Sequence, residues 1–120
     1  MNNNFEFKKY PECQFFVSHY LADDKAIAII IKDLATDEAI CKCTTYNESF
    51  DYEIGIATIK NYSENKGITE FLRNLKIVEE VRESYKANDL AEDSETIDVC
   101  KLNLKILKSY ANEWHYAERN

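Results

Sequence analysis

The sequence contains very little glycine and proline, with two glycines and one proline among 120 residues. Turns that need a positive backbone φ must therefore be scarce, and glycine-rich loops that cradle phosphate groups have almost no material to be built from. The longest apolar stretch, Ala26 to Ile31, is far shorter than the about 20 residues that a membrane-spanning helix needs. No basic segment leads into an apolar run after Met1, so no signal peptide is predicted. We expect a cytoplasmic protein that makes no contact with membranes.

Positive charge is also in short supply, because 15 basic residues face 22 acidic ones and leave a net charge of −7. Lys and Arg supply most of the affinity of proteins for nucleic acid, so this balance disfavours direct nucleic-acid binding. A solvated acidic surface that keeps a cytosolic protein soluble is the simpler interpretation. The alternative is an acidic face that docks into a basic groove of a partner.

The motifs of common enzyme classes are missing from the sequence. Nucleophilic catalysis needs a Ser or Cys beside a base, and the only two histidines stand outside any recognisable motif. The G-x-S-x-G, phosphate-loop and H-E-x-x-H patterns do not occur. We therefore expect a binding protein and not an enzyme.

The length fits one domain with a single core, since 45% of the residues are hydrophobic. Alternation of side chains, aromatic residues and β-branched residues indicate strands. The predicted strands cover residues 5–10, 14–21, 26–31, 39–46 and 54–60.

A helix is predicted after the last of these strands. Ser63 is a suitable N-cap, and apolar residues recur at positions 68, 71, 72 and 75, which form one face of a helix. Gly67 would lie inside this helix and allow close packing on a strand. Residues 77–86 fit a helix or a strand, residues 88–95 indicate an acidic loop, and residues 100–106 indicate a strand whose spacing becomes helical from 104 to 114. The expected fold is α+β: an antiparallel sheet of about five strands with one packed central helix and a short C-terminal helix.

The four cysteines are Cys13, Cys41, Cys43 and Cys100. In the cytoplasm they are expected to be reduced, and the simplest interpretation is that they are small buried residues. The alternative is a structural zinc site, in which Cys41 and Cys43 share one face of a strand and Cys13 and Cys100 complete a tetrahedron. His19 is a weaker candidate ligand, whereas His115 is expected on the surface.

Residues 60–67, Lys-Asn-Tyr-Ser-Glu-Asn-Lys-Gly, are followed by apolar residues at positions 68, 72, 77 and 78. This run resembles the K-x-[YW]-S-E-N-x-G motif of a family of small proteins from phages and other mobile elements, and it covers about a fifth of the chain. Lys66 stands where the family usually has an acidic residue that forms a capping box with Ser63, and Lys76 stands where a helix-ending Gly is usual. The resemblance implies a mobile-element setting and brings no catalytic residues. By analogy with small acidic inhibitors of RNA-guided nucleases from that setting, it suggests an anti-CRISPR protein.

The expected function is therefore an inhibitor that blocks nucleic-acid loading of a host defence nuclease, its expected partner, through an acidic surface. Two acidic clusters are the candidate partner-binding residues: Glu79, Glu80 and Glu83, and Asp89, Glu92, Asp93 and Glu95. The alternative is a non-catalytic structural or regulatory accessory protein of a mobile element, either stabilised by zinc or a homodimer. Salt distinguishes the two, because a charge-driven inhibitor loses affinity steeply as ionic strength rises.

Overall fold

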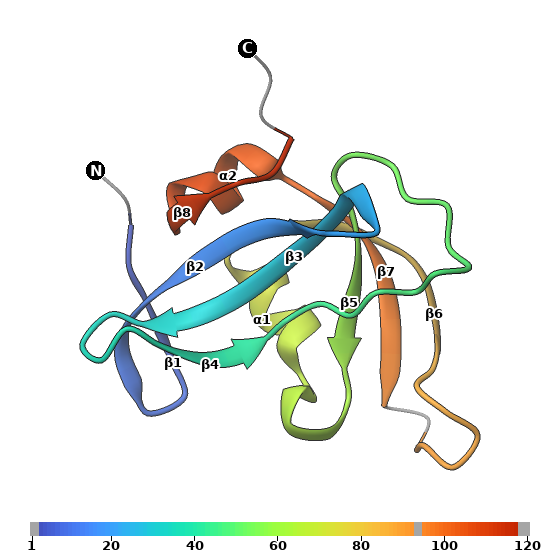
Figure 1. Cartoon of the computed structure of the whole chain (residues 1–120). Helices are drawn as coiled ribbons and strands as arrows, with labels where there is room; N and C mark the ends of the chain where they lie inside the picture. The colour runs from blue at the N-terminus through green and yellow to red at the C-terminus, as the bar shows by residue number, and fades with distance from the viewer. Residues whose placement is uncertain (1–2, 93–94, 118–120) are drawn as a thin grey trace.

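In a computed structural model that describes residues 3–92 and 95–117, the chain forms eight strands, two α-helices and one short 3-10 helix, η1 (Figure 1). The elements are β1 (Phe5–Phe7), β2 (Tyr10–Tyr20), β3 (Asp23–Asp33), β4 (Glu38–Lys42), β5 (Ile56–Asn61), η1 (Ser63–Asn65), α1 (Ile68–Asn74), β6 (Val78–Lys86), β7 (Thr96–Leu102), α2 (Leu104–Ser109) and β8 (Ala111–Trp114). The α+β class and the mainly antiparallel pairing are confirmed. The strands form two sheets, of five and three strands, where a single sheet of about five was predicted.

The first sheet has the order β1-β2-β3-β4, and β8 runs parallel to β2. Strands β1 and β8 face different stretches of β2, because β1 lies opposite Tyr10 to Cys13 and β8 opposite Phe15 to Val17. Alternate residues of β2 and β3 point into the core, as the period of a strand requires. The apolar side chains that these two strands contribute to the core are those of Cys13, Phe15, Val17, Ile27, Ile29 and Ile31.

The segment after β4 joins the two sheets. The Cys43 N–H donates to the carbonyl of Ile29 in the first sheet at 2.9 Å, while the Cys43 carbonyl accepts from the Lys60 N–H of β5 at 2.8 Å. The second sheet continues in the order β5-β7-β6. Helix α1 links both sheets, because it contacts β5 and β6 while the ring of Phe71 lies 5.1 Å from that of Phe7 in β1. Figure 1 shows α1 between the first sheet and β5.

Helix α1 begins later than predicted, and its cap is a different residue. Ser63 lies in η1 with a φ of 57°, and α1 starts after Gly67, whose φ is 96°. The N-cap residue is Gly67, and the side-chain oxygen of Asn61 supplies the capping acceptor, because it accepts hydrogen bonds from the N–H groups of Gly67 at 2.9 Å and Thr69 at 3.3 Å. The prediction of Ser63 as the N-cap was wrong. Gly67 is needed for its left-handed backbone and not for close packing, since a Cβ added there would meet no atom within 4 Å.

Residues 77–86, for which helix and strand both remained open, form the strand β6 after Ile77. Its pairing with β7 shifts register twice, between Val78 and Glu80 and between Val81 and Glu83. Each shift adds one residue to β6, so Val78, Val81 and Ser84 lie opposite alternate residues of β7. Val78 and Val81, the residues of this strand that pack in or against the core, are therefore three positions apart, and that spacing imitates a helix.

The C-terminal part follows the prediction only at first. Strand β7 ends at Leu102, and α2 starts at Leu104 with the side chain of Asn103 accepting from the Ile106 N–H at 3.0 Å. The helix stops at Ser109, because residues 111–114 pair with β2 as strand β8, where a helix was predicted. Across the two described ranges, no helix has the length and apolar character to cross a membrane.

Candidate functional site

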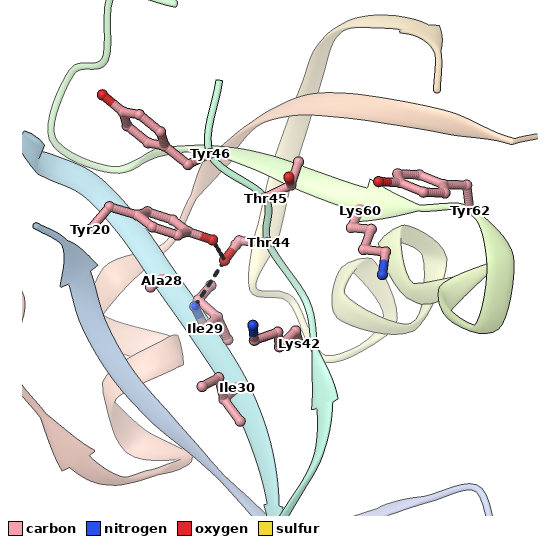
Figure 2. A pocket seen from close by; sticks show the side chains of 10 residues that line it. All are labelled: Tyr20, Ala28, Ile29, Ile30, Lys42, Thr44, Thr45, Tyr46, Lys60 and Tyr62. Atoms are coloured by element: carbon pink, nitrogen blue, oxygen red, sulfur yellow. Dashed lines mark hydrogen bonds between the residues drawn. The ribbon is translucent and has the colours of Figure 1, made fainter. Parts of the chain in front are cut away.

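A groove of about 340 Å³ crosses the segment that joins the two sheets (Figure 2). It is built from β2, β3, the segment 42–46 and the end of β5 with the residue after it. Its lining residues are Tyr20, Ala28, Ile29, Ile30, Lys42, Thr44, Thr45, Tyr46, Lys60 and Tyr62. Two ammonium groups and three phenol rings thus gather on one surface of an acidic protein.

The tyrosine wall of the groove is held by hydrogen bonds and ring contacts. The hydroxyl oxygens of Tyr20 and Thr44 lie 3.0 Å apart, and the Thr44 hydroxyl also accepts from the Ile29 N–H at 3.1 Å. Burial raises the pKa of the Tyr20 phenol, so it stays protonated. The ring of Tyr46 packs between those of Tyr20 and Tyr52, with centroids 5.2 and 5.6 Å away. This wall is therefore preorganised.

The two lysines of the groove differ in their partners. The Lys60 ammonium lies 2.8 Å from a carboxylate oxygen of Glu64 and 5.3 Å from the centroid of the Tyr62 ring. This hydrogen bond raises the pKa of Lys60 and lowers the pKa of Glu64 to about 2. The ammonium of Lys42 has no acidic partner within residues 3–92 and 95–117, so it is free to meet an anion.

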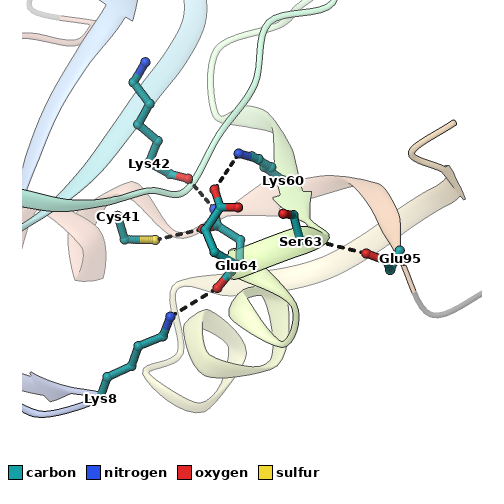
Figure 3. Close-up of polar contacts among 8 residues, drawn as sticks. Lys8, Cys41, Lys42, Lys60, Ser63, Glu64 and Glu95 are labelled. Carbon is teal, nitrogen blue, oxygen red and sulfur yellow. Dashed lines mark hydrogen bonds and ion pairs between the residues drawn. The ribbon is translucent and has the colours of Figure 1, made fainter. Parts of the chain in front are cut away.

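The thiols of Cys41 and Cys43 interact through a side-chain hydrogen bond, as their shared face predicts, but the four cysteines do not form one group among the described residues. Figure 3 shows the surroundings of Cys41. All four are buried, as the simpler interpretation predicted. Cys41 donates to the side-chain oxygen of Asn65 at 3.5 Å, Cys13 to the Tyr10 carbonyl, and Cys100 to the Asp98 carbonyl. Burial raises the pKa of the Cys100 thiol to about 12, which disfavours the thiolate that a metal needs.

No group of three or more His, Cys, Asp and Glu side chains is placed to hold a metal ion among the described residues. The predicted tetrahedron of Cys13, Cys41, Cys43 and Cys100 is therefore not formed. His19 is exposed, with its Nδ1 atom 3.0 Å from the Tyr20 carbonyl oxygen. His115 is exposed, as predicted, and its Nε2 atom lies 4.0 Å from a carboxylate oxygen of Glu113.

The first predicted acidic cluster lies on β6. Glu79 is 3.9 Å from the Lys101 ammonium, and Glu80 is 3.4 Å from the Nε atom of Arg82. Both pairs are solvent-exposed, so each contributes little and can exchange for another partner. Glu83 is exposed. Because β6 is the terminal strand of its sheet, these carboxylates lie along an outer edge.

The second cluster lies on the loop between β6 and β7. Glu95 accepts a hydrogen bond at 3.1 Å from the N–H of Ser63 (Figure 3), and Glu92 forms an ion pair of 3.7 Å with Lys66. These contacts fold the loop back onto η1. Asp89 is exposed, whereas Asp93 lies outside the described residues.

Most of the net charge of the protein comes from these two clusters. Residues 78–95 contain seven acidic and two basic residues, so this segment carries five of the seven net negative charges. Six of the nine residues of β6 are exposed. The rest of the chain is close to neutral, and the acidic character is a property of one edge of the molecule.

Comparisons with protein-family models, with curated proteins and with solved structures found no match to this chain. A function must therefore be argued from its own residues. The acidic clusters were visible in the sequence as a composition bias. The groove was not visible in the sequence, because its residues come from four segments that lie side by side only where the two sheets join. Its one local signal in the sequence is the pair Lys60 and Tyr62, two positions apart.

Proposed function

We propose that the protein is a non-catalytic inhibitor that binds the basic groove of a host defence nuclease and so blocks nucleic-acid loading. The contact surface is the acidic strip, which we define as Glu79, Glu80, Glu83, Asp89, Glu92, Asp93 and Glu95. The observation that carries the proposal is the concentration of five of the seven net negative charges in residues 78–95, on an exposed edge strand and its loop.

Electrostatics favour such a partner. A groove that binds nucleic acid is lined by Lys and Arg, and its field attracts and orients an acidic surface as it does a phosphate backbone. The weak pairs of Glu79 with Lys101 and of Glu80 with Arg82 can be replaced by the partner's cations at little cost. Affinity should then fall as salt is added.

The same strip disfavours self-association through β6. Charged side chains and bulges on an edge strand oppose edge-to-edge pairing, and β6 has both. A second copy would bring the same carboxylates together. A partner of opposite charge suits this edge better than a homodimer does.

The biological setting is part of the proposal. Residues 60–67 resemble a phage and mobile-element family, which favours an anti-CRISPR role against an RNA-guided nuclease in the host cytoplasm. The alternative function is that of a structural or regulatory accessory protein of the mobile element. A dimeric accessory protein would bury apolar surface, and its association would respond little to salt.

A pull-down from cells that express a panel of RNA-guided nucleases tests the proposal. The tagged protein should retain one nuclease in stoichiometric amount at low salt, and nucleic acid should compete for the same site. Washing at rising ionic strength should release the nuclease steeply. A preparation that retains no nuclease, or one whose nuclease keeps its guide and target bound, would contradict the proposal.

A further inference from the structure

The groove at the joint of the two sheets lies outside the acidic strip and has the opposite character. Lys42 and Lys60 both line it, and the carboxylate of Glu64 is paired with Lys60. The protein as a whole has a net charge of −7, so two lysines beside a single acidic group mark a local reversal of sign. Such a site attracts a small anion.

The groove also contains an aromatic ring, that of Tyr62, with the Lys60 ammonium over one of its faces. Tyr62 is half-buried, and apart from the Lys60 ammonium its ring contacts no charged group or aromatic ring in the described part of the chain. Figure 2 shows Lys60 and Tyr62 on one side of the segment 42–46, with Tyr20 on the other. Thr45 places a further hydroxyl between them. A planar ring that stacks on the face of Tyr62 opposite the Lys60 ammonium would leave its phosphate beside that ammonium. The long Lys42 side chain, which Figure 2 shows on the other side of the segment 42–46, would turn across to meet it.

We propose that this groove binds a nucleotide, with the phosphate held by Lys42 and Lys60 and the base stacked on Tyr62. Its volume of about 340 Å³ is at the lower end of the range for small-molecule sites. Lys binds phosphate as a mobile point charge, and phenol rings stack on every base, so this set of residues recognises the class without choosing the base.

Glu64 sets the strength of the site. The Glu64 carboxylate forms an ion pair of 2.8 Å with the Lys60 ammonium, so a phosphate must compete with Glu64 for this lysine. The Glu64→Gln variant keeps the shape of the side chain and removes its charge. Nucleotide affinity should therefore rise in this variant, an effect that a general loss of structure would not produce.

Isothermal titration calorimetry with adenosine monophosphate, adenosine and inorganic phosphate tests the ring and the phosphate separately. The nucleotide should bind at least about tenfold more tightly than either component, because stacking and charge pairing add. Binding of phosphate or adenosine as tight as that of the nucleotide would overturn the proposal. Binding of an oligothymidylate without binding of the nucleotide would assign the groove to a strand of nucleic acid and overturn it as well.

Variants locate the site. Lys42→Met and Tyr62→Leu should each weaken nucleotide binding by about tenfold. The matched control is Lys105→Met, which removes an exposed lysine from α2 and should leave affinity unchanged. Circular dichroism and thermal melting show whether each variant is folded. If a folded Lys42→Met variant binds the nucleotide as tightly as the wild type, the assignment is contradicted. It is also contradicted if Lys105→Met weakens nucleotide binding as much as Lys42→Met does.

Discussion

The carboxylate of Asp98 on β7 accepts a hydrogen bond of 2.6 Å from the hydroxyl of Thr69 on α1. The same carboxylate accepts from Ser84 on β6 and from Thr96, each at 2.7 Å. Asp98 is only 5% exposed, so this charge is buried and satisfied by three hydroxyl groups. It ties the helix and the acidic edge strand to the centre of the second sheet.

Replacement of Asp98 by Ala should lower the free energy of unfolding by about 2 kcal/mol, because three hydroxyls, of which that of Thr69 is buried, lose their acceptor. Urea denaturation measures the change. The control is Asp89→Ala in the exposed loop, which should change stability by less than about 0.5 kcal/mol. Similar midpoints for the two variants would show that the Asp98 cluster does not hold the sheet together.

Asn61 and Ser63 provide a matched test of the helix start. Asn61→Ala removes the acceptor of two backbone N–H groups and should cost about 1 kcal/mol of stability. Ser63→Ala should be nearly neutral, since Ser63 stands in η1 and not at the cap of α1. Denaturant midpoints compare the two. The opposite ranking would place the cap where the sequence pattern predicted it.

The pair of Lys60 and Glu64 gives a pH-dependent prediction. Hydrogen bonds from Lys60, the larger cause, and from the Ser63 side chain hold the pKa of Glu64 at about 2, below the ordinary value of 4.5. A lowered carboxyl pKa stabilises the folded state above pH 4.5, and this contribution is lost as the pH falls towards 2.

NMR titration of the Glu64 side chain measures this directly. In the wild type the midpoint should lie near 2, and in Lys60→Met it should return towards 4.5. Lys105→Met serves as the control and should leave the midpoint unchanged. A midpoint near 4.5 in the wild type would mean that the pair does not persist in solution.

The sequence predicted those elements whose side chains follow one simple period. Ile27, Ile29 and Ile31 alternate into the core of β3, and Ile68 and Leu72 lie on the buried face of α1, so the pattern identified both elements. The positions of these residues are determined mainly by burial in the core, and the periodicity of hydrophobic residues in a sequence indicates which positions are buried.

The remaining features depend on contacts between distant residues. The hydroxyl of Tyr116 accepts from the Gly55 N–H at 2.9 Å and donates to the Lys25 carbonyl at 2.6 Å, across 61 and 91 residues. Pairing of β8 with β2 overrode a helical spacing, and bulges gave β6 the period of a helix. Of the candidate sites, the acidic strip could be predicted from the run of acidic residues in the sequence. Whether the four cysteines lie together could be learned only from the folded structure.

A binding assay with two charge-reversed variants tests the central claim most directly. The strip variant combines Glu79→Lys, Glu80→Lys and Glu83→Lys. The control variant makes the same change in net charge at three exposed acidic residues of the first sheet, Glu6, Glu12 and Glu38.

Both variants are compared with the wild type for binding and inhibition of the captured nuclease, after circular dichroism has shown that they are folded. The strip variant should lose binding and inhibition, while the control variant should retain most of both, because only the strip faces the basic groove. If both variants lose binding and inhibition equally, the loss follows from the change in net charge and not from the acidic strip. Unchanged inhibition by the folded strip variant would contradict the account.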